Sequence, residues 1–333
     1  MPTMMLRRNL VVSCVVLVLV LPVLGWAVAQ LPRQPLEAGV LDVPVGTHAG
    51  ELAAQLREGH GMRMPVWLFR LYTRLDGSAA RLQAGEYQVG DGETVAGLLA
   101  RMVAGDVVSR KVVLVEGWTF RQVLAALHRS PRLEHRLRGM DEPEVRALLG
   151  IRRPNLEGLF LPDTYAYVAG MSDVDILKRA HARMNALLEK RWAERAPGLP
   201  YVTPYEALIA ASLVEKETGR AEDRDDIAAV FVRRLRLGMR LQTDPTVIYA
   251  LGEAFDGNLR RVHLSLDHPY NTYVYAGLPP SPIALAGDAS LRAALNPAST
   301  DALFFVARGD GSSVFSATLR DHEAAVDRYQ RGN

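Results

Sequence analysis

Three similar units in the N-terminal part of the chain constrain its fold most strongly. Each is predicted to form a strand, a tight glycine turn, a capping residue and an amphipathic helix, with the turns at Gly46, Gly92 and Gly117. An apolar stretch at 65–72, predicted to be helical, lies between the first two units, and a strand is predicted at 84–89. The sequence therefore predicts an α+β fold that begins with the order strand–helix–helix–strand.

The composition narrows the class of protein. The 333 residues suffice for about two domains of ordinary size, and an apolar fraction of 49% supports a real core. The net charge is +2, and no long basic block or basic-aromatic pattern indicates a nucleic-acid partner. Cys14 is the one cysteine, which excludes a disulfide framework and a cysteine-based zinc site. No metal-binding or phosphate-loop motif occurs, so we expect neither a metal nor a cofactor.

The N-terminus indicates the compartment. Arg7 and Arg8 precede an apolar run over 10–29, which is long enough to span a bilayer. The positive flank predicts a cytoplasmic N-terminus and export of the rest. A cleaved signal peptide is the alternative, because Ala27-Val28-Ala29 is an acceptable small-x-small cleavage site. We favour the single-pass anchor, and under either interpretation the body works outside the cytoplasm.

A short apolar helix with two glutamates at its end is predicted over 203–219. Thr203 is the expected N-cap, Pro204 takes the first helical position, and Glu206 completes a capping box. Gly219 is expected to end the helix as its C′ residue. At about 100° per residue, one apolar stripe is expected, made by Ile209, Ala210, Leu213 and Val214.

The stripe separates the two glutamates. Glu217 falls near its centre, and Glu215 falls on the opposite side, near Leu208 and Ala211. Burial of Glu217 would raise its pKa, and the carbonyl end of the helix acts in the same direction. A carboxylic acid that stays protonated near neutral pH can donate to a glycosidic oxygen. The alternative is a structural salt bridge with an arginine, and this helix alone does not favour the acid.

The remaining elements are predicted along the chain. A turn-rich aromatic segment is expected at 155–165, and helices are expected at 173–195 and 225–237. Asp244, before Pro245, is expected to cap another helix. Strands on either side of Gly309-Asp-Gly311 are predicted to form a β-hairpin, and His322 lies in a final helix.

Several segments together resemble the endolytic murein transglycosylase family (MltG, also called YceG-like). They are Leu156-Glu-Gly-Leu-Phe-Leu-Pro-Asp-Thr-Tyr165, Ala211-Ser-Leu-Val-Glu-Lys-Glu-Thr-Gly219, Arg234-Leu-Arg-Leu-Gly-Met239, Leu241-Gln-Thr-Asp-Pro-Thr-Val-Ile-Tyr249, Tyr270-Asn-Thr-Tyr273 and Gly277-Leu-Pro-Pro280. Their order and combination are specific. The chain departs from the family pattern at Ser281, where glycine is frequent, and in Phe160-Leu-Pro162, where Leu-Phe-Pro is more usual.

The resemblance implies a domain organisation and a reaction. It implies an anchor and linker at 1–36, a LysM-like α/β subdomain at 37–110 and a mixed α+β catalytic domain at 111–333. A packing domain that only spaces the enzyme from the membrane remains the alternative for 37–110. The implied reaction is non-hydrolytic cleavage of MurNAc–GlcNAc bonds in nascent peptidoglycan, which leaves 1,6-anhydro-MurNAc ends. Glu217 maps onto the family's catalytic glutamate and would act as acid and then as base.

Candidate substrate contacts lie in the same motifs. Amides can bond sugar hydroxyls and acetamides, and aromatic rings can stack on sugar faces. Glu157 is expected to orient the loop around residue 155, and Asp244 is expected mainly as a helix cap. The substrate-binding candidates are Glu157, Tyr165, Gln242, Asp244, Tyr270, Asn271 and Tyr273.

Two other functions stay open from the sequence. One is a muramidase-type hydrolase that uses the same acid with a second carboxylate. The other is a non-catalytic glycan-binding scaffold for cell-wall synthases. The partners implied are peptidoglycan glycan strands and the membrane, and the family's role adds peptidoglycan synthases.

Overall fold

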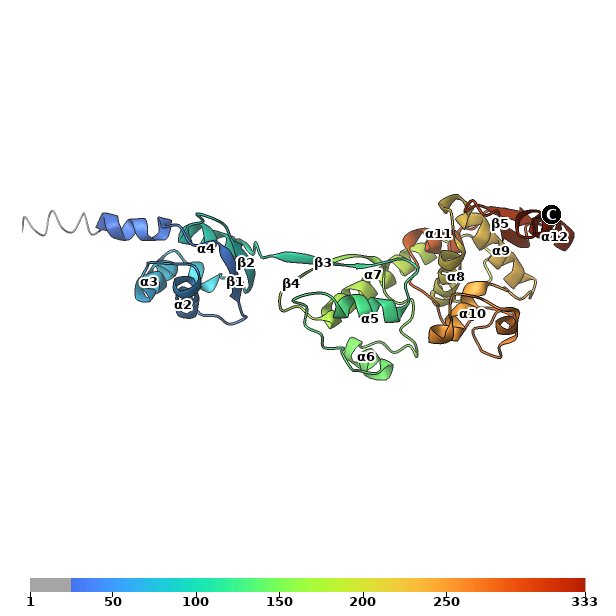
Figure 1. Cartoon of the computed structure of the whole chain (residues 1–333), viewed down its shortest axis with the longest axis horizontal. Coiled ribbons are helices and arrows are strands. Elements are labelled where there is room, and N and C mark those ends of the chain that lie inside the picture. Colours follow the sequence, from blue (N-terminus) through green and yellow to red (C-terminus); the bar gives the residue numbers. More distant parts are fainter. Residues whose placement is uncertain (1–24, 333) are drawn as a thin grey trace, which may run out of the picture. The chain divides into compact units, whose positions relative to one another are not determined.

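The computed structural model describes residues 25–332 and divides them into two compact units (Figure 1). Unit 1 comprises the described residues up to Arg110 together with 168–170, and unit 2 comprises 111–167 and the residues from Met171 onward. Most of the predicted anchor lies outside the described residues. Within residues 25–332, no helix is both long enough and apolar enough to cross a membrane.

Unit 1 is built around one antiparallel strand pair. Its elements are the 3-10 turns η1 (Leu31–Arg33) and η2 (Ser78–Ala80), the strands β1 (Gly39–Val43) and β2 (Gly85–Val89), and the helices α2 (Ala49–Gly59), α3 (Val66–Leu75) and α4 (Val95–Ala104). The order β1-α2-α3-β2 confirms the predicted strand–helix–helix–strand arrangement. Leu41 of β1 lies opposite Tyr87 of β2, and both side chains are buried in a core that unit 1 forms by itself.

Unit 2 contains most of the helices. After β3 (Ser109–Leu114) come α5 (Phe120–His128), α6 (Glu142–Leu149), β4 (Asp163–Val168), α7 (Asp173–Ala193), α8 (Pro204–Glu217), η3 (Ala221–Asp223), α9 (Arg224–Arg236), α10 (Asp244–Leu251), η4 (Gly252–Ala254), η5 (Arg261–Ser265), α11 (Asp288–Leu295), β5 (Phe304–Ala307), β6 (Ser313–Ser316) and α12 (Leu319–Tyr329). β3 and β4 form one two-stranded sheet, and β5 and β6 form another. The predicted α+β class is confirmed.

The longer predicted elements are found close to their expected bounds. The helices expected at 173–195 and 225–237 are α7 and α9, and Gly238 after α9 adopts the left-handed conformation that stops a helix (φ 66°). The predicted hairpin is β5–β6, with Phe305 opposite Phe315. Two short helices, α6 and α11, were not predicted from the sequence.

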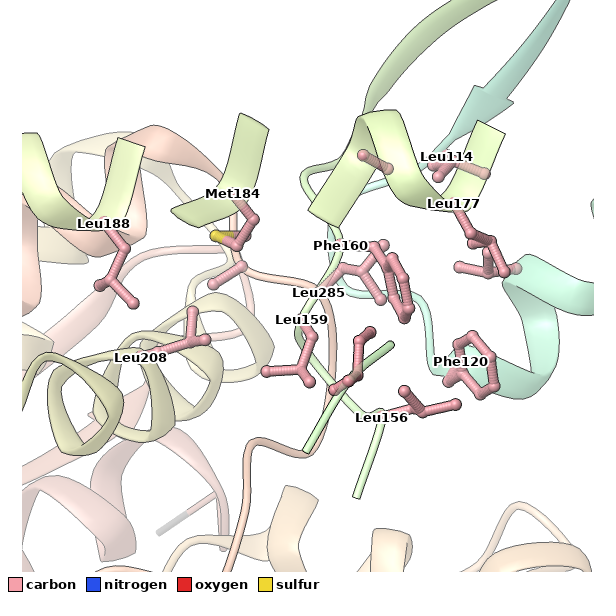
Figure 2. Close-up of a cluster of buried hydrophobic side chains, with 14 of the residues drawn as sticks. Leu114, Phe120, Leu156, Leu159, Phe160, Leu177, Met184, Leu188, Leu208 and Leu285 are labelled. Atoms are coloured by element: carbon pink, nitrogen blue, oxygen red, sulfur yellow. The ribbon is translucent and has the colours of Figure 1, made fainter. Parts of the chain in front are cut away.

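The main core of unit 2 encloses the helix that carries the two glutamates. Phe120 and Phe160 stack with their ring centroids 5.2 Å apart, and Figure 2 shows them together with Leu156 and Leu159. α8 contributes Leu208 to this cluster and packs against α11, α9 and α7. Its second half adds Leu213 and Val214 to a separate apolar cluster. Apolar neighbours therefore cover α8 on all sides.

Candidate active site

The start and end of α8 explain where the two glutamates lie. The Thr203 side chain accepts a hydrogen bond from the Glu206 backbone N, as expected of an N-cap. The predicted capping box is wrong, because the Glu206 carboxylate instead accepts from the backbone N of Val202 at 2.5 Å. The helix ends at Glu217 with Thr218 as C-cap.

The position after the helix, Gly219, requires glycine for a different reason than the predicted C′ turn. Its φ is not positive, so it does not form the left-handed C′ turn. A Cβ at this position would lie 2.9 Å from the backbone O of Gly311, in the turn between β5 and β6. Close approach of two backbone segments is therefore what requires glycine here.

The predicted apolar stripe does not distinguish the faces of α8. All eight residues from Ala207 to Val214 are buried, so the helix is covered all round rather than on one side. Glu215 and Glu217 are both partly buried. Glu215 Oε2 accepts a hydrogen bond from the backbone N of Gly287 at 2.9 Å, just before α11. Glu215 therefore holds the backbone at the start of α11.

Glu217 differs from Glu215 in its environment. Burial raises the pKa of Glu217 to about 7; a hydrogen bond from Thr243 acts to lower it, and the nearby charge of Asp244 acts to raise it. Thr243 Oγ1 donates that hydrogen bond to Glu217 Oε1. Glu217 Oε2 has no hydrogen-bond partner among residues 25–332. The residue retains some exposed surface, so this second oxygen is the one that can exchange a proton with a substrate.

Three buried threonines form a network that fixes the position of the Thr243 hydroxyl, which donates to Glu217. The Thr243 backbone N donates to Thr272 Oγ1 at 3.1 Å, and its carbonyl accepts from Thr246 Oγ1 at 2.7 Å. The hydroxyls of Thr246 and Thr272 lie 2.9 Å apart. These bonds hold the Thr243 backbone from both sides, so its hydroxyl is already oriented toward the acid.

Two exposed candidates flank Thr243. Gln242 is a non-glycine residue with a positive φ of 51°, and its backbone N donates to Thr272 O at 3.1 Å. Asp244 is the first residue of α10, so the predicted cap is wrong by one position: the N-cap is Thr243, whose side chain bonds Glu217 instead of the helix. Asp244 Oδ1 accepts from the Tyr273 hydroxyl at 2.5 Å. The structure therefore brings Glu217, Asp244 and Tyr273 into one group.

Glu157 is the second carboxyl with a strongly perturbed pKa. It is only 5% exposed, and burial raises its pKa to about 7. Its Oε1 accepts from the Phe120 backbone N at 2.8 Å, and its Oε2 accepts from the Tyr249 hydroxyl at 3.3 Å. These bonds connect the loop around residue 155 to the start of α5 and to α10. They agree with the expected loop-orienting role, and they leave no exposed surface for a sugar.

Tyr270 lies in a neighbouring polar cluster. Its hydroxyl is 2.6 Å from Ser281 Oγ, and Asn155 Nδ2 donates to both hydroxyls at 3.1 and 3.2 Å. The centroid of the Tyr270 ring lies 4.9 Å from that of Tyr249 and 5.6 Å from that of His268. Tyr270 is partly exposed, so it keeps surface on which a sugar could stack.

Two predicted substrate contacts, Tyr165 and Asn271, are buried. Tyr165 is 3% exposed in the main core, and its hydroxyl donates to the carbonyl of Leu161 at 2.7 Å. Asn271 is fully buried; its Nδ2 donates to the carbonyls of Leu264 and Leu266, and its Oδ1 accepts from Tyr273 N. Tyr165 lies in β4 and Asn271 lies in a loop, and neither side chain faces solvent.

No metal centre accompanies these residues. Across residues 25–332, no three His, Cys, Asp or Glu side chains lie close enough together to hold a metal ion. A surface hollow exists in the connection between α7 and α8, where residues 195–199 and Tyr201 line it. None of the candidate site residues borders that hollow.

A family model matches almost the whole chain. The model of the YceG-like family covers residues 41–328, which includes both units and every residue of the site. The chain belongs to the YceG-like family.

Two relatives of this YceG-like chain have the same name. It is 32% identical over 308 residues to a Bacillus subtilis (strain 168) protein named endolytic murein transglycosylase, a match that covers 87% of this chain and 84% of that relative. A protein of the same name from Streptococcus pneumoniae serotype 2 is 31% identical over 184 residues, which is 53% of this chain and 33% of the relative.

A solved structure shares the fold. A crystal structure of a putative YceG-like protein from Listeria monocytogenes matches with a TM-score of 0.56 and 29% identity, and the match covers 86% of this chain and 98% of that chain.

The hydroxyl residues of the site were missed from the sequence. Thr243 and Thr246 lie in the segment that begins at Leu241, and Thr272 lies between Asn271 and Tyr273. The predicted substrate contacts are all carboxylate, amide or aromatic side chains, and these three threonine hydroxyls are not among them. The available signal was the presence of all three threonines in the same two motifs as Gln242, Asp244 and Tyr273.

Proposed function

We propose that this YceG-like protein is an endolytic murein transglycosylase that cleaves MurNAc–GlcNAc bonds of peptidoglycan. The observation that carries the proposal is Glu217, whose pKa of about 7 leaves it available both as an acid and as a base near neutral pH. The named relatives support the same activity, because the family match includes the whole segment around Glu217.

The proposed mechanism uses one carboxyl twice. Protonated Glu217 donates from Oε2 to the glycosidic oxygen, so the bond to the anomeric carbon of MurNAc breaks and GlcNAc leaves with a free hydroxyl. The resulting carboxylate then takes the proton of the MurNAc C6 hydroxyl, and that oxygen bonds the anomeric carbon to close a 1,6-anhydro ring. Glu217 ends protonated and no water is consumed. Thr243 stabilises the carboxylate between the two steps.

The remaining candidates have distinct proposed roles. Gln242, Asp244, Tyr270 and Tyr273 are exposed or partly exposed around or near Glu217, and we assign them to sugar binding. Glu157 positions the loop around residue 155 from below the surface. Ser281 stands where family members often have glycine, and here it holds the Tyr270 hydroxyl.

Mass spectrometry of the products of purified glycan strands tests the function. We expect the wild type to release anhydro ends, each one water lighter than the end that a hydrolase leaves. Glu217→Gln should release neither product, because an amide donates no proton to the glycosidic oxygen. Glu215→Gln is the matched control: an amide oxygen can still accept from Gly287 N, so this variant should cut like the wild type.

Each outcome decides between the candidate functions. Hydrolytic ends from the wild type would favour a muramidase that uses Asp244 as its second carboxylate, since that side chain lies near Glu217. Full activity of Glu217→Gln would refute the proposed acid. Glycan binding without any cleavage would indicate a scaffold.

The proposed setting is the outer face of the cytoplasmic membrane. The apolar run at 10–29 would be a single-pass anchor with a cytoplasmic N-terminus, and residues 111–333 would be an exported catalytic domain. Residues 37–110 would be a LysM-like subdomain, which the order β1-α2-α3-β2 supports. Cleavage of nascent strands would end their elongation, with peptidoglycan synthases as partners.

A further inference from the structure

An apolar stripe lies exposed on α3 in unit 1. Trp67, Leu71 and Leu75 follow one another at four-residue spacing, so they lie along one side of the helix. They are 66%, 45% and 78% exposed. The opposite side of α3 holds Phe69 and Thr73, which are fully buried in unit 1. The stripe is therefore additional to the side that α3 needs for folding.

Arginines accompany the stripe. Arg70 and Arg74 lie on the same exposed side of the helix, and Arg63 is exposed just before it. Neither Arg70 nor Arg74 has an acidic partner within salt-bridge distance among the described residues 25–332. Asp76, directly after the helix, is the nearby acid along the chain, and its carboxylate accepts from the backbone N of Ser78. The face thus combines tryptophan, leucine and unpaired positive charge.

The chain enters unit 1 directly from the apolar run. That run ends at Ala29, and Leu31 already packs against the core of unit 1. Two residues span at most about 7 Å. Further along, the Leu36 side chain is only 3% exposed, and the Leu36 backbone N donates to Glu93 O at 2.7 Å. A bilayer that held the run would therefore lie against unit 1, with no flexible spacer between them.

We infer that α3 docks on the anionic surface of the bilayer that holds the chain. This inference rests on the proposed anchor. Tryptophan and leucine enter the headgroup region of a bilayer, while arginines on the flanks meet lipid phosphates. Helices that lie in the membrane plane have this composition. Docking would fix unit 1 against the membrane by two attachments, the anchor and α3.

The test places a nitroxide spin label on the stripe of the full-length chain. Cys14 is the one native cysteine, so Cys14→Ser gives a background in which a single new cysteine can be labelled. Leu71→Cys reports on α3. Val45→Cys is the matched control, because it is an apolar residue of unit 1 that is 94% exposed outside α3. Accessibility to oxygen, which concentrates in lipid, is compared with accessibility to a water-soluble nickel chelate in vesicles.

Docking predicts a clear difference between the two positions. In vesicles that contain phosphatidylglycerol, the label at 71 should gain oxygen accessibility and lose nickel accessibility, while the label at 45 should stay in water. Replacing Arg70 and Arg74 by glutamine should weaken docking about thirtyfold, since each arginine near an anionic surface contributes about fivefold. Neutral phosphatidylcholine vesicles should give a similar loss.

Three results would overturn the inference. A label at 71 that stays in water excludes docking. Loss of accessibility to both reagents would mean that protein or glycan covers α3 instead of lipid. Equal lipid exposure at 45 and 71 would mean that unit 1 approaches the membrane without a specific role of α3. Whether the chain stays in vesicles after alkaline extraction tests the anchor separately, so the two proposals can fail independently.

Discussion

The hydrogen bond from Thr243 to Glu217 offers the sharpest test of the proposed chemistry. Thr243→Val removes the donor and keeps the shape of the side chain, and the Thr243 backbone remains held by Thr246 and Thr272. The bond stabilises the charged carboxylate and so acts to lower the pKa of Glu217. Removing it must therefore raise the pKa above its value of about 7.

The magnitude follows from the strength of such a bond. A hydrogen bond to a charged group contributes about 1.5 kcal/mol at the lower end of its range, which suits a partly exposed site and corresponds to a shift of about 1 pH unit. The alkaline limb of the cleavage rate should then move from near pH 7 to about pH 8. At about pH 8.5 the variant should keep roughly eight times more of its own maximal rate than the wild type keeps.

The assay is the initial rate of anhydro-end release, followed by mass spectrometry across the pH range. Thr243→Ser is the control, because it retains the hydroxyl and should keep the wild-type profile. An alkaline limb that stays in place in Thr243→Val, or moves to lower pH, would refute the reasoning. A serine variant that shifts as far as the valine variant would show that the methyl group, not the hydroxyl, sets the pKa.

Three further predictions concern the buried residues around the site. Because the pKa of Glu157 is raised to about 7, its contribution to stability is present at low pH and is lost as the pH rises through 7. Glu157→Gln should therefore gain about 2.5 kcal/mol of unfolding free energy relative to the wild type between about pH 5 and pH 8. Urea unfolding measures this, and a difference that stays constant with pH would contradict it. Phe160→Ala should cost unit 2 about 3–5 kcal/mol of unfolding free energy, because the ring is fully buried against Phe120, and a loss below about 1 kcal/mol would mean that the core collapses around the gap. Both Gly158 and Gly150 have positive φ, but only a Cβ at 158 would collide with Pro282. Gly158→Ala should therefore lower the unfolding free energy clearly more than the roughly 1 kcal/mol expected for Gly150→Ala. Equal shifts in melting temperature would argue against that contact.

The sequence predicted the parts of the fold that depend on local patterns. α7, α9 and the β5–β6 hairpin have clear periodicity and clear end signals, so they lie where the pattern placed them. α6 and α11 are eight residues long, which is too short for periodicity to stand out. α8 was found, but its face was misjudged, because α11 covers a side that the pattern left to solvent.

The site was predictable only as far as residue types reveal function. Glu217 was singled out by its place on the predicted apolar stripe and by its match to the family motif. Its raised pKa agrees with that choice, although the stripe itself does not distinguish the faces of α8. Tyr165 and Asn271 were selected by residue type, but their burial depends on how unit 2 packs around them. Their polar atoms bond carbonyls close by in the chain, at Leu161 for Tyr165 and at Leu264 and Leu266 for Asn271. Likewise, no local rule connects Thr243 with an acid 26 residues earlier.

The burial of residues 207–214 in α8 has a consequence for motion. Its backbone amides are covered by α7, α9 and α11, so they can exchange with solvent only when the surrounding unit opens. The residues that hold and surround the Glu217 carboxyl come instead from the segments at 242–246 and 270–273, most of which lie outside regular helices. Hydrogen–deuterium exchange should therefore be slower in α8 than in the two segments that surround the Glu217 carboxyl, so that the helix carrying Glu217 is the more rigid part of the site.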